Sequence, residues 1–189
     1  MAKKGTKMLI EELTHTVIDW NDFEAAGELS RRVLQELDED RAAIRNLVQT
    51  REGIAVVGVN GTTLVLGQWP EQGFELLLHL FQPFDQGRPH SHRRCFSTRI
   101  LNGGYRHTWF GKSDEHEQST NSALVPYLTR FETAGSTYTL HPTAVHSIDP
   151  SPDTVALTIC EPGSSEAAPG EGTGAFGEAV ADIEHLRVI

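Results

Sequence analysis

Three histidines have the residue type and the spacing of metal ligands. His90 and His92 stand one residue apart in the run Gly-Arg-Pro-His-Ser-His, and on a strand such a pair points to one face because side chains alternate. Residues 135–146, which end at His146, can supply a third imidazole from elsewhere in the fold. Neutral imidazole nitrogens suit first-row transition metals. We therefore predict one metal ion held by His90, His92 and His146.

The chain around these histidines has the pattern of short β-strands. Residues 54–59 and 62–66 are β-branched runs joined by Asn60-Gly61, a pair typical of a tight hairpin. Many short strands, separated by turn residues and not by helices, indicate an antiparallel sandwich or barrel. The other strands that we predict are residues 74–81, 99–101, 105–110, 123–133, 136–140 and 154–160.

The two ends of the chain have different patterns. Apolar residues recur at helical spacing after Asn21 and Asp22, which are good helix N-caps, and again after residues 38–40. Residues 163–174 have the Gly-, Ser- and Pro-rich composition of a flexible linker, and 175–189 are either a short docking helix or a frayed tail. The predicted segments are helical (1–52), β-barrel (53–162) and linker with tail (163–189).

Charge and cysteine content narrow the classes of partner. The net charge is −10, with 26 acidic and 16 basic residues, which argues against nucleic acid as a partner. Two cysteines are too few for a disulfide framework, and no apolar run resembles a membrane span or a secretion signal, so we expect a cytoplasmic protein. Arginines near the histidines predict a site for an anionic small molecule, unless they are solvated strand-edge residues: Arg88, Arg93, Arg94, Arg99 and Arg106.

The two histidine segments resemble the paired motifs of the cupin superfamily. The matching residues are Gly87, His90, His92 and Gly104 in the first motif and Gly135, Pro142 and His146 in the second. The resemblance implies an all-β core folded as a double-stranded β-helix, the cupin or jelly-roll barrel, here with an N-terminal helical extension. The glutamate of the first motif would fall on Ser97, so the resemblance implies three histidine ligands without a carboxylate.

Within that superfamily the chain is most similar to the three-histidine enzymes of the cysteine dioxygenase (thiol dioxygenase) group. Residues 62–110 can be laid on that group without a gap, and 155–162 match its last barrel strand. The group's substrate arginine would fall on Leu64, and the cysteine that some members cross-link to tyrosine on Ser97. Its serine–histidine–tyrosine set is replaced by Ala156, Thr158 and Cys160. The resemblance implies metal binding, but not cysteine as the substrate.

The same alignment suggests how a substrate is held. It places Ser97 and Arg99 on the interior face with the metal histidines, where a guanidinium is costly without an anion. Arg99 is therefore our candidate for gripping a carboxylate or phosphate. The alternatives are that Arg99 extends to an open barrel end or pairs with Glu132 or Glu75. The candidate substrate contacts are Arg99, Phe81, Ser97, Thr158 and Cys160.

Two residues are candidates for proton transfer. His79 would face inward from the strand before the metal pair, as a general base or a hydrogen-bond partner of a ligand, or else as a core histidine. Tyr105 shares one face of its strand with His107 and Trp109, and the sequence leaves open whether that face is interior. If it is, Tyr105 can also move a proton.

Three functions compete at this stage. The leading hypothesis is an iron(II)-dependent dioxygenase, because three neutral ligands leave open positions and favour an anionic amino acid, thiol or carboxylate as the substrate beside dioxygen. The alternative is a cupin lyase, isomerase or decarboxylase that uses Zn, Ni or Mn as a Lewis acid. The third is a non-catalytic ligand-binding cupin. We expect no organic cofactor, and the family resemblance implies a homodimer through an edge strand.

Overall fold

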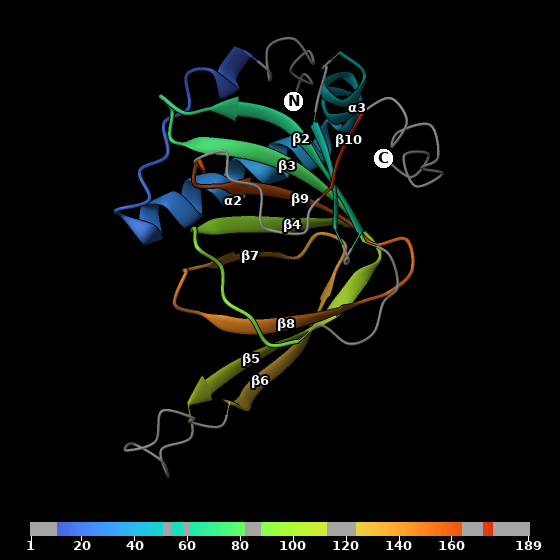
Figure 1. The fold of residues 1–189 in the computed structure, drawn as a ribbon. Helices are drawn as coiled ribbons and strands as arrows, with labels where there is room; N and C mark the ends of the chain where they lie inside the picture. Colours follow the sequence, from blue (N-terminus) through green and yellow to red (C-terminus); the bar gives the residue numbers. More distant parts are fainter. Residues whose placement is uncertain are drawn as a thin grey trace.

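The computed structural model describes residues 11–50, 54–58, 61–81, 88–112, 124–163 and 172–175. In this part of the chain two antiparallel sheets pack against each other, and helices α2 and α3 cover the outer face of the larger sheet (Figure 1). The all-β core with an N-terminal helical extension confirms the predicted fold class. The arrangement of the two sheets is consistent with a double-stranded β-helix.

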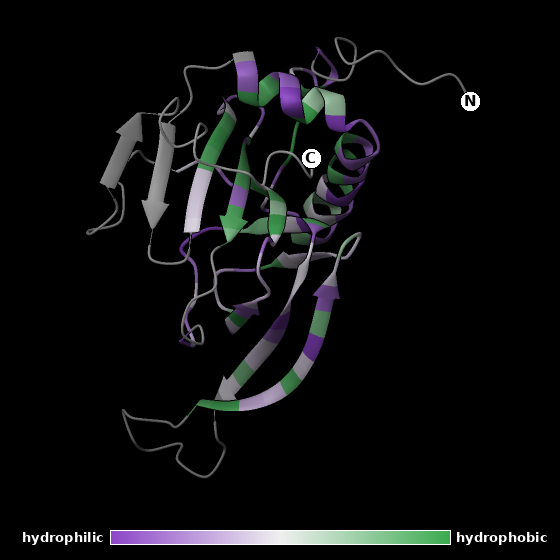
Figure 2. Cartoon of the chain, turned by 90° about the vertical axis from the view of Figure 1, so that its right-hand side faces the viewer, coloured by the Kyte–Doolittle hydropathy of each residue, from purple (hydrophilic) through white to green (hydrophobic). Residues whose placement is uncertain are grey.

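The two helices form where their caps and spacing predict. Helix α2 spans Phe23–Glu39, and the Asp22 side chain accepts a hydrogen bond from the Ala25 N–H at its start. Helix α3 spans Arg41–Thr50. Hydrophilic and hydrophobic bands alternate along the helices, as expected for helices that bury one face (Figure 2). Of the helices in the described residues, none is long and apolar enough to cross a bilayer.

The larger sheet has seven strands and the smaller has three. The larger sheet runs in the order β10 (Gly172–Ala175), β1 (Ile54–Gly58), β2 (Gly61–Trp69), β3 (Phe74–Phe81), β9 (Val155–Cys160), β4 (Phe96–Asn102) and β7 (Thr137–Leu140). The smaller sheet runs in the order β6 (Leu124–Thr133), β5 (Gly104–Lys112) and β8 (Val145–Pro150).

Side-chain alternation along the larger sheet creates two hydrophobic cores. One face packs on the helices and includes Leu34, Leu37, Ile44, Leu64, Leu78 and Leu157. The other face packs on the smaller sheet and includes Phe96, Ile100, Tyr105, Trp109, Tyr138, Ala156 and Cys160. Because the helices share the first core with the sheet, their removal would expose the sheet's apolar outer face.

Two strands were not predicted. Strand β8 carries His146 but includes Ser147, Asp149 and Pro150, which have low strand propensity, and pairing with β5 along six residues holds it extended. Strand β10 begins in the segment expected to be a linker, so that prediction is wrong for residues 172–174, which pair with β1. The helix or tail expected at 175–189 lies outside the described residues except for Ala175, and Asn60 of the predicted turn also lies outside them.

The prediction that Ser97 and Arg99 face the barrel interior is wrong, because the alternation of side chains along β4 is shifted by one residue. Phe96 and Ile100 of β4 face the smaller sheet, whereas Leu101 faces the helices. Ser97 and Arg99 alternate with Phe96 and therefore lie on the helix side. The chain bends at residues 93–94, so the alternation that starts at His92 does not continue into β4. A shift of one residue exchanges the two faces of a strand.

Candidate metal centre

Three histidine rings converge where the segment before β4 meets β8. One ring nitrogen each from His90, His92 and His146 lies within 4.8 Å of the other two. The ring centroids are 4.9 Å apart for His90 and His92, and 4.7 and 5.0 Å from that of His146. Within the described residues, no further Asp, Glu, Cys or His belongs to this group. The structure thus brings together the three residues predicted as ligands.

Backbone pairing, and not a regular strand, positions these histidines. His90 forms an isolated β-bridge with His146, in which the His90 N–H donates to the His146 carbonyl at 2.8 Å and the His146 N–H donates back at 2.9 Å. The prediction that the His-x-His pair lies on a strand is therefore wrong in detail. Gly87 of the predicted motif lies outside the described residues.

The rings have the protonation that metal binding needs. Burial, with smaller contributions from His90 and Arg94, lowers the pKa of His92 to about 4. Burial, followed by the neighbouring histidines, lowers the pKa of His146 to about 2. The Arg88 carbonyl lies 2.9 Å from His90 Nδ1, so Nδ1 donates and Nε2 keeps its lone pair. Neutral imidazoles with lone pairs directed at one point fit a divalent transition metal.

An aromatic wall replaces the carboxylate of the resembled motif. The Phe96 ring lies 4.6 Å from the His92 ring and 6.4 Å from the His146 ring, measured between centroids. His146 is only 2% exposed, whereas His90 and His92 keep contact with solvent. A ligand can therefore approach from the solvent side of His90 and His92, while Phe96 and β8 close the inner side.

Tyr105, His107 and Trp109 lie on the interior face of β5. The sequence had left open whether this face or the opposite one is interior. All three side chains are buried. The Tyr105 and Tyr138 hydroxyls lie 2.5 Å apart, and burial raises the pKa of Tyr138 to about 12 and that of Tyr105 well above its ordinary value. Both phenols are therefore hydrogen-bond donors at neutral pH.

Three other predicted residues lie on the inner face of the larger sheet. The Thr158 hydroxyl bonds with that of Thr98 at 2.8 Å, so Thr158 extends the buried polar groups beside Tyr138. The Cys160 thiol lies 3.8 Å from the Glu75 carboxylate, and burial raises its pKa to about 12. Cys160 is thus a protonated buried thiol and not a nucleophile. Phe81 packs edge-on against Tyr105 with ring centroids 5.8 Å apart.

His79 faces inward as predicted. Its Nδ1 lies 2.9 Å from the Thr63 hydroxyl, and its ring stacks on Phe81. Burial, followed by the charge of His92, lowers the pKa of His79 to about 4. At neutral pH His79 is therefore an uncharged ring.

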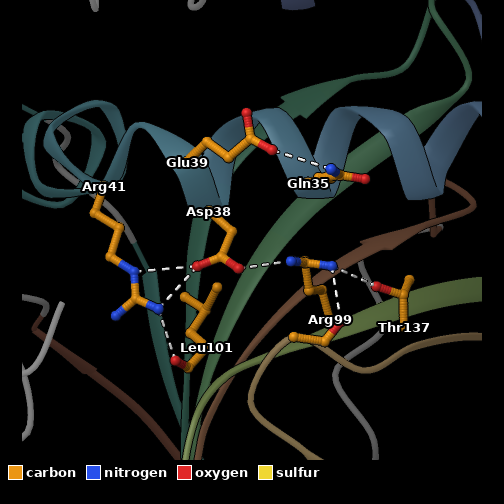
Figure 3. Close-up of polar contacts among 8 residues, drawn as sticks. Gln35, Asp38, Glu39, Arg41, Arg99, Leu101 and Thr137 are labelled. Carbon is orange, nitrogen blue, oxygen red and sulfur yellow. Dashed lines mark hydrogen bonds and ion pairs between the residues drawn. The ribbon is translucent and has the colours of Figure 1, made fainter.

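Arg99 lies on the helix side of the larger sheet, where its guanidinium meets Asp38 of α2 (Figure 3). Its Nε donates to Asp38 Oδ2 of α2 at 2.8 Å, and its Nη1 donates to the Gly135 carbonyl at 2.9 Å. Ser97 also faces the helices and bonds with Thr139 at 2.8 Å. Neither residue reaches the metal histidines, and the anion that Arg99 meets is a carboxylate of its own chain.

Sequence reasoning missed Arg94 as a distinct candidate. Its Nη1 donates to Glu75 Oε2 and to the Glu161 carbonyl, each at 2.9 Å, and its side chain is 38% exposed. Its charge is close enough to lower the pKa of His92. The position of Arg93 and Arg94 directly after the histidine pair indicated that one of them could lie near the metal. The sequence could not show which, because the directions of their side chains depend on the bend before β4.

The metal-free protein should lose stability as the pH falls from 7 to 5. Burial above all lowers the pKa of His107 to about 3, and that of His146 is about 2. The unfolded chain takes up protons near pH 6.5 while these folded residues do not, so the free energy of unfolding falls below pH 6.5. His107 and His146 alone predict a loss of about 2–4 kcal/mol between pH 7 and pH 5, and the lowered pKa values of His79 and His92 add to it.

Urea unfolding in the presence of EDTA at both pH values measures this loss. A His141→Gln variant is the control, since His141 is exposed, and it should show the same difference as the wild type. An unfolding free energy that is equal at the two pH values would contradict neutral, buried His107 and His146.

Comparisons with known proteins do not assign this chain to a family. No family model matches the chain, and no curated protein matches it. An RmlC-like cupin from Shewanella frigidimarina NCIMB 400 is 14% identical, with 62% of this chain and 89% of that one covered and a TM-score of 0.45. KdgF from Halomonas sp. is 14% identical, with 57% and 85% covered and a TM-score of 0.42.

A third solved structure with a similar arrangement is hydroquinone 1,2-dioxygenase PnpCD in complex with Cd2+ and 4-hydroxybenzonitrile. It is 14% identical, with 52% of this chain and 63% of that chain covered and a TM-score of 0.40. Likeness at this level establishes neither family membership nor activity. The fold described here rests on the chain's own strand order, and the candidate centre rests on its own geometry.

Proposed function

We propose that this chain is a mononuclear metal enzyme, and specifically an iron(II) dioxygenase that acts on a small anionic metabolite. The observation that carries the proposal is the convergence of three imidazoles within 4.8 Å, with solvent on one side and a buried wall on the other. Such a ligand set, when it holds iron(II), supplies open positions for a substrate and dioxygen.

The charge of the site favours an anionic substrate. His90, His92 and His146 bring no negative charge, so a divalent ion held by them would be uncompensated by its ligands. A substrate carboxylate or thiolate would supply that charge. Arg94 is the cation that we assign to a second acidic group of the substrate, because its guanidinium stays 38% exposed even though its Nη1 pairs with Glu75. Arg99 no longer has that role, since it is 15% exposed and pairs with Asp38 on the helix side of the sheet.

One residue would accept a proton from a bound substrate, and a pair of others would donate a hydrogen bond to it. His79 would act as a neutral base in the tautomer in which Nδ1–H donates to the Thr63 hydroxyl, because Nε2 then keeps its lone pair to accept a proton. Tyr105 and Tyr138 remain protonated, and since one hydroxyl donates to the other, the pair would have one proton left to donate to a developing negative charge. Phe81 and Phe96 exclude water from the inner side of the site.

The same acid and base groups support a second candidate function. A neutral His79 and a protonated Tyr105, which both contact Phe81, could shift a proton on a substrate without any redox step, as a lyase, isomerase or decarboxylase requires. Zinc, nickel or manganese would serve as the Lewis acid in that case. The choice between the two candidates depends on whether dioxygen is consumed.

Oxygen uptake distinguishes the two candidates. Metal content is first measured on protein purified without chelator, and the iron(II)-loaded and zinc-loaded forms are then compared in an oxygen electrode with a panel of small acids and thiols. We expect substrate-dependent oxygen uptake in the iron form and none in the zinc form. Conversion of a substrate without oxygen uptake in either form would overturn the dioxygenase and support the lyase or isomerase.

A further inference from the structure

His107 is a fully buried histidine that lies behind the candidate metal centre. Its Nε2 lies 2.8 Å from His146 Nδ1, and it is 0% exposed. The other nitrogen of His146, Nε2, lies 2.8 Å from His92 Nε2 on the metal side. His146 therefore uses its two ring nitrogens in opposite directions, one toward the candidate centre and one toward His107.

This arrangement determines where the protons must lie when a metal is bound. A ligating His146 Nε2 carries no proton, so Nδ1 carries it and donates to His107 Nε2. His107 then has its own proton on Nδ1, whose nearest carboxylate oxygen is Glu132 Oε1 at 3.4 Å. In the described part of the chain, His107 Nδ1 is one of two buried side-chain polar atoms without a hydrogen bond. A small shift of Glu132 would satisfy it.

Glu132 is held in place from its other side. It is 3% exposed, and Arg130 Nε donates to its Oε1 at 2.6 Å. The Arg130 guanidinium lies 4.9 Å from the centroid of the Trp109 ring, and Trp109 stacks on His107 with centroids 3.5 Å apart. The four side chains thus form one packed unit on β5 and β6, with the carboxylate directed at the far side of His107.

We propose that His107 and Glu132 are positioning residues for the metal centre. Together they hold His146 in the tautomer that binds metal through Nε2, because Glu132 Oε1 faces the Nδ1–H that His107 must then carry. Partners of this kind raise the basicity of a ligating imidazole, and their loss typically weakens metal binding by about 10- to 100-fold. The inference rests on the proposed metal centre and adds to it a role for residues outside the ligand set.

Zinc affinity, measured by competition with a chromophoric chelator, tests this assignment. We expect His107→Leu and Glu132→Gln each to raise the zinc Kd by at least about 10-fold. Because Glu132 acts through His107, the double variant should bind no more weakly than His107→Leu alone. Asp149→Asn is the matched control: it removes the same charge from β8 but breaks an exposed pair with Arg106, and its Kd should stay within about threefold of the wild type.

Two results would overturn the proposal. One is a Glu132→Gln Kd within about threefold of the wild type, and the other is a zinc-loaded wild type whose imidazole nitrogen NMR spectrum shows His107 protonated on Nε2. The spectrum needs no variant, so it decides the question even if His107→Leu does not fold. If the wild type itself binds no zinc, the proposed metal centre is wrong, and so is the positioning role of His107 and Glu132. If the wild type binds zinc and the variants bind it equally well, only the positioning role is contradicted.

Discussion

Replacing His146 with alanine should abolish metal-dependent stabilisation of the protein. His146 is the ligand on a regular strand, so His146→Ala removes one of the three donors, whereas the backbone bridge to His90 does not depend on the imidazole. A metal that binds the folded state alone stabilises it by about 4 kcal/mol at a thousandfold excess over its Kd. Thermal unfolding with and without zinc should therefore show a rise in Tm for the wild type and none for the variant.

A second histidine variant controls for the loss of a histidine as such. His141 lies five residues earlier, is exposed, and its Nδ1 bonds with the Thr143 hydroxyl, so His141→Ala should keep the full zinc-induced rise in Tm. His92→Ala removes a ligand that contacts solvent and should lose the rise without the packing defect that alanine leaves at the buried position 146. A zinc-induced rise in both ligand variants would contradict the proposed ligands.

Replacing Asp38 with alanine should destabilise the protein by about 2–4 kcal/mol without changing its metal affinity. Asp38 accepts hydrogen bonds from Arg99 Nε at 2.8 Å and from Arg41 Nη2 at 2.8 Å, and its side chain is 13% exposed (Figure 3). The variant would leave two guanidinium groups between α2 and β4 without their carboxylate. Chemical unfolding measures the loss, and zinc competition measures the affinity.

The matched control is an ion pair on the same helix that solvent surrounds. Glu28 and Arg31 have side chains 55% and 51% exposed, so Glu28→Ala should cost no more than about 0.5 kcal/mol. Arg99→Ala should resemble Asp38→Ala in stability and leave the affinity for a small anionic ligand unchanged. Normal stability with weakened anion binding in Arg99→Ala would instead restore the substrate role first predicted for this arginine.

Features that depend on local pattern were predicted well. The Asp22 cap and the apolar spacing after it located α2, and β-branched runs located β1 and β2. The three histidines were identified from their spacing. The inward positions of His79, Thr158 and Cys160 also followed, because β3 and β9 are regular strands in which alternation holds from end to end.

Features that depend on a local break in regularity were not predicted. The bend at residues 93–94 reverses the faces of β4, and this single irregularity moved Arg99 from the expected site to the helix interface. Strand β8 is specified by its pairing with β5 and not by its own composition. His146, His107 and Glu132 lie on three different strands, so the spacing of residues within one segment cannot predict that their side chains meet.

The most direct test of the central claim is the metal stoichiometry of wild-type and His146→Ala protein after loading and desalting, measured by elemental analysis. The structure predicts one tightly held divalent ion per wild-type chain, since the described residues hold one group of three converging donors, and none in the variant. A wild type that retains no ion, or a folded variant that retains a full equivalent, would contradict the assignment of His90, His92 and His146 as a metal centre.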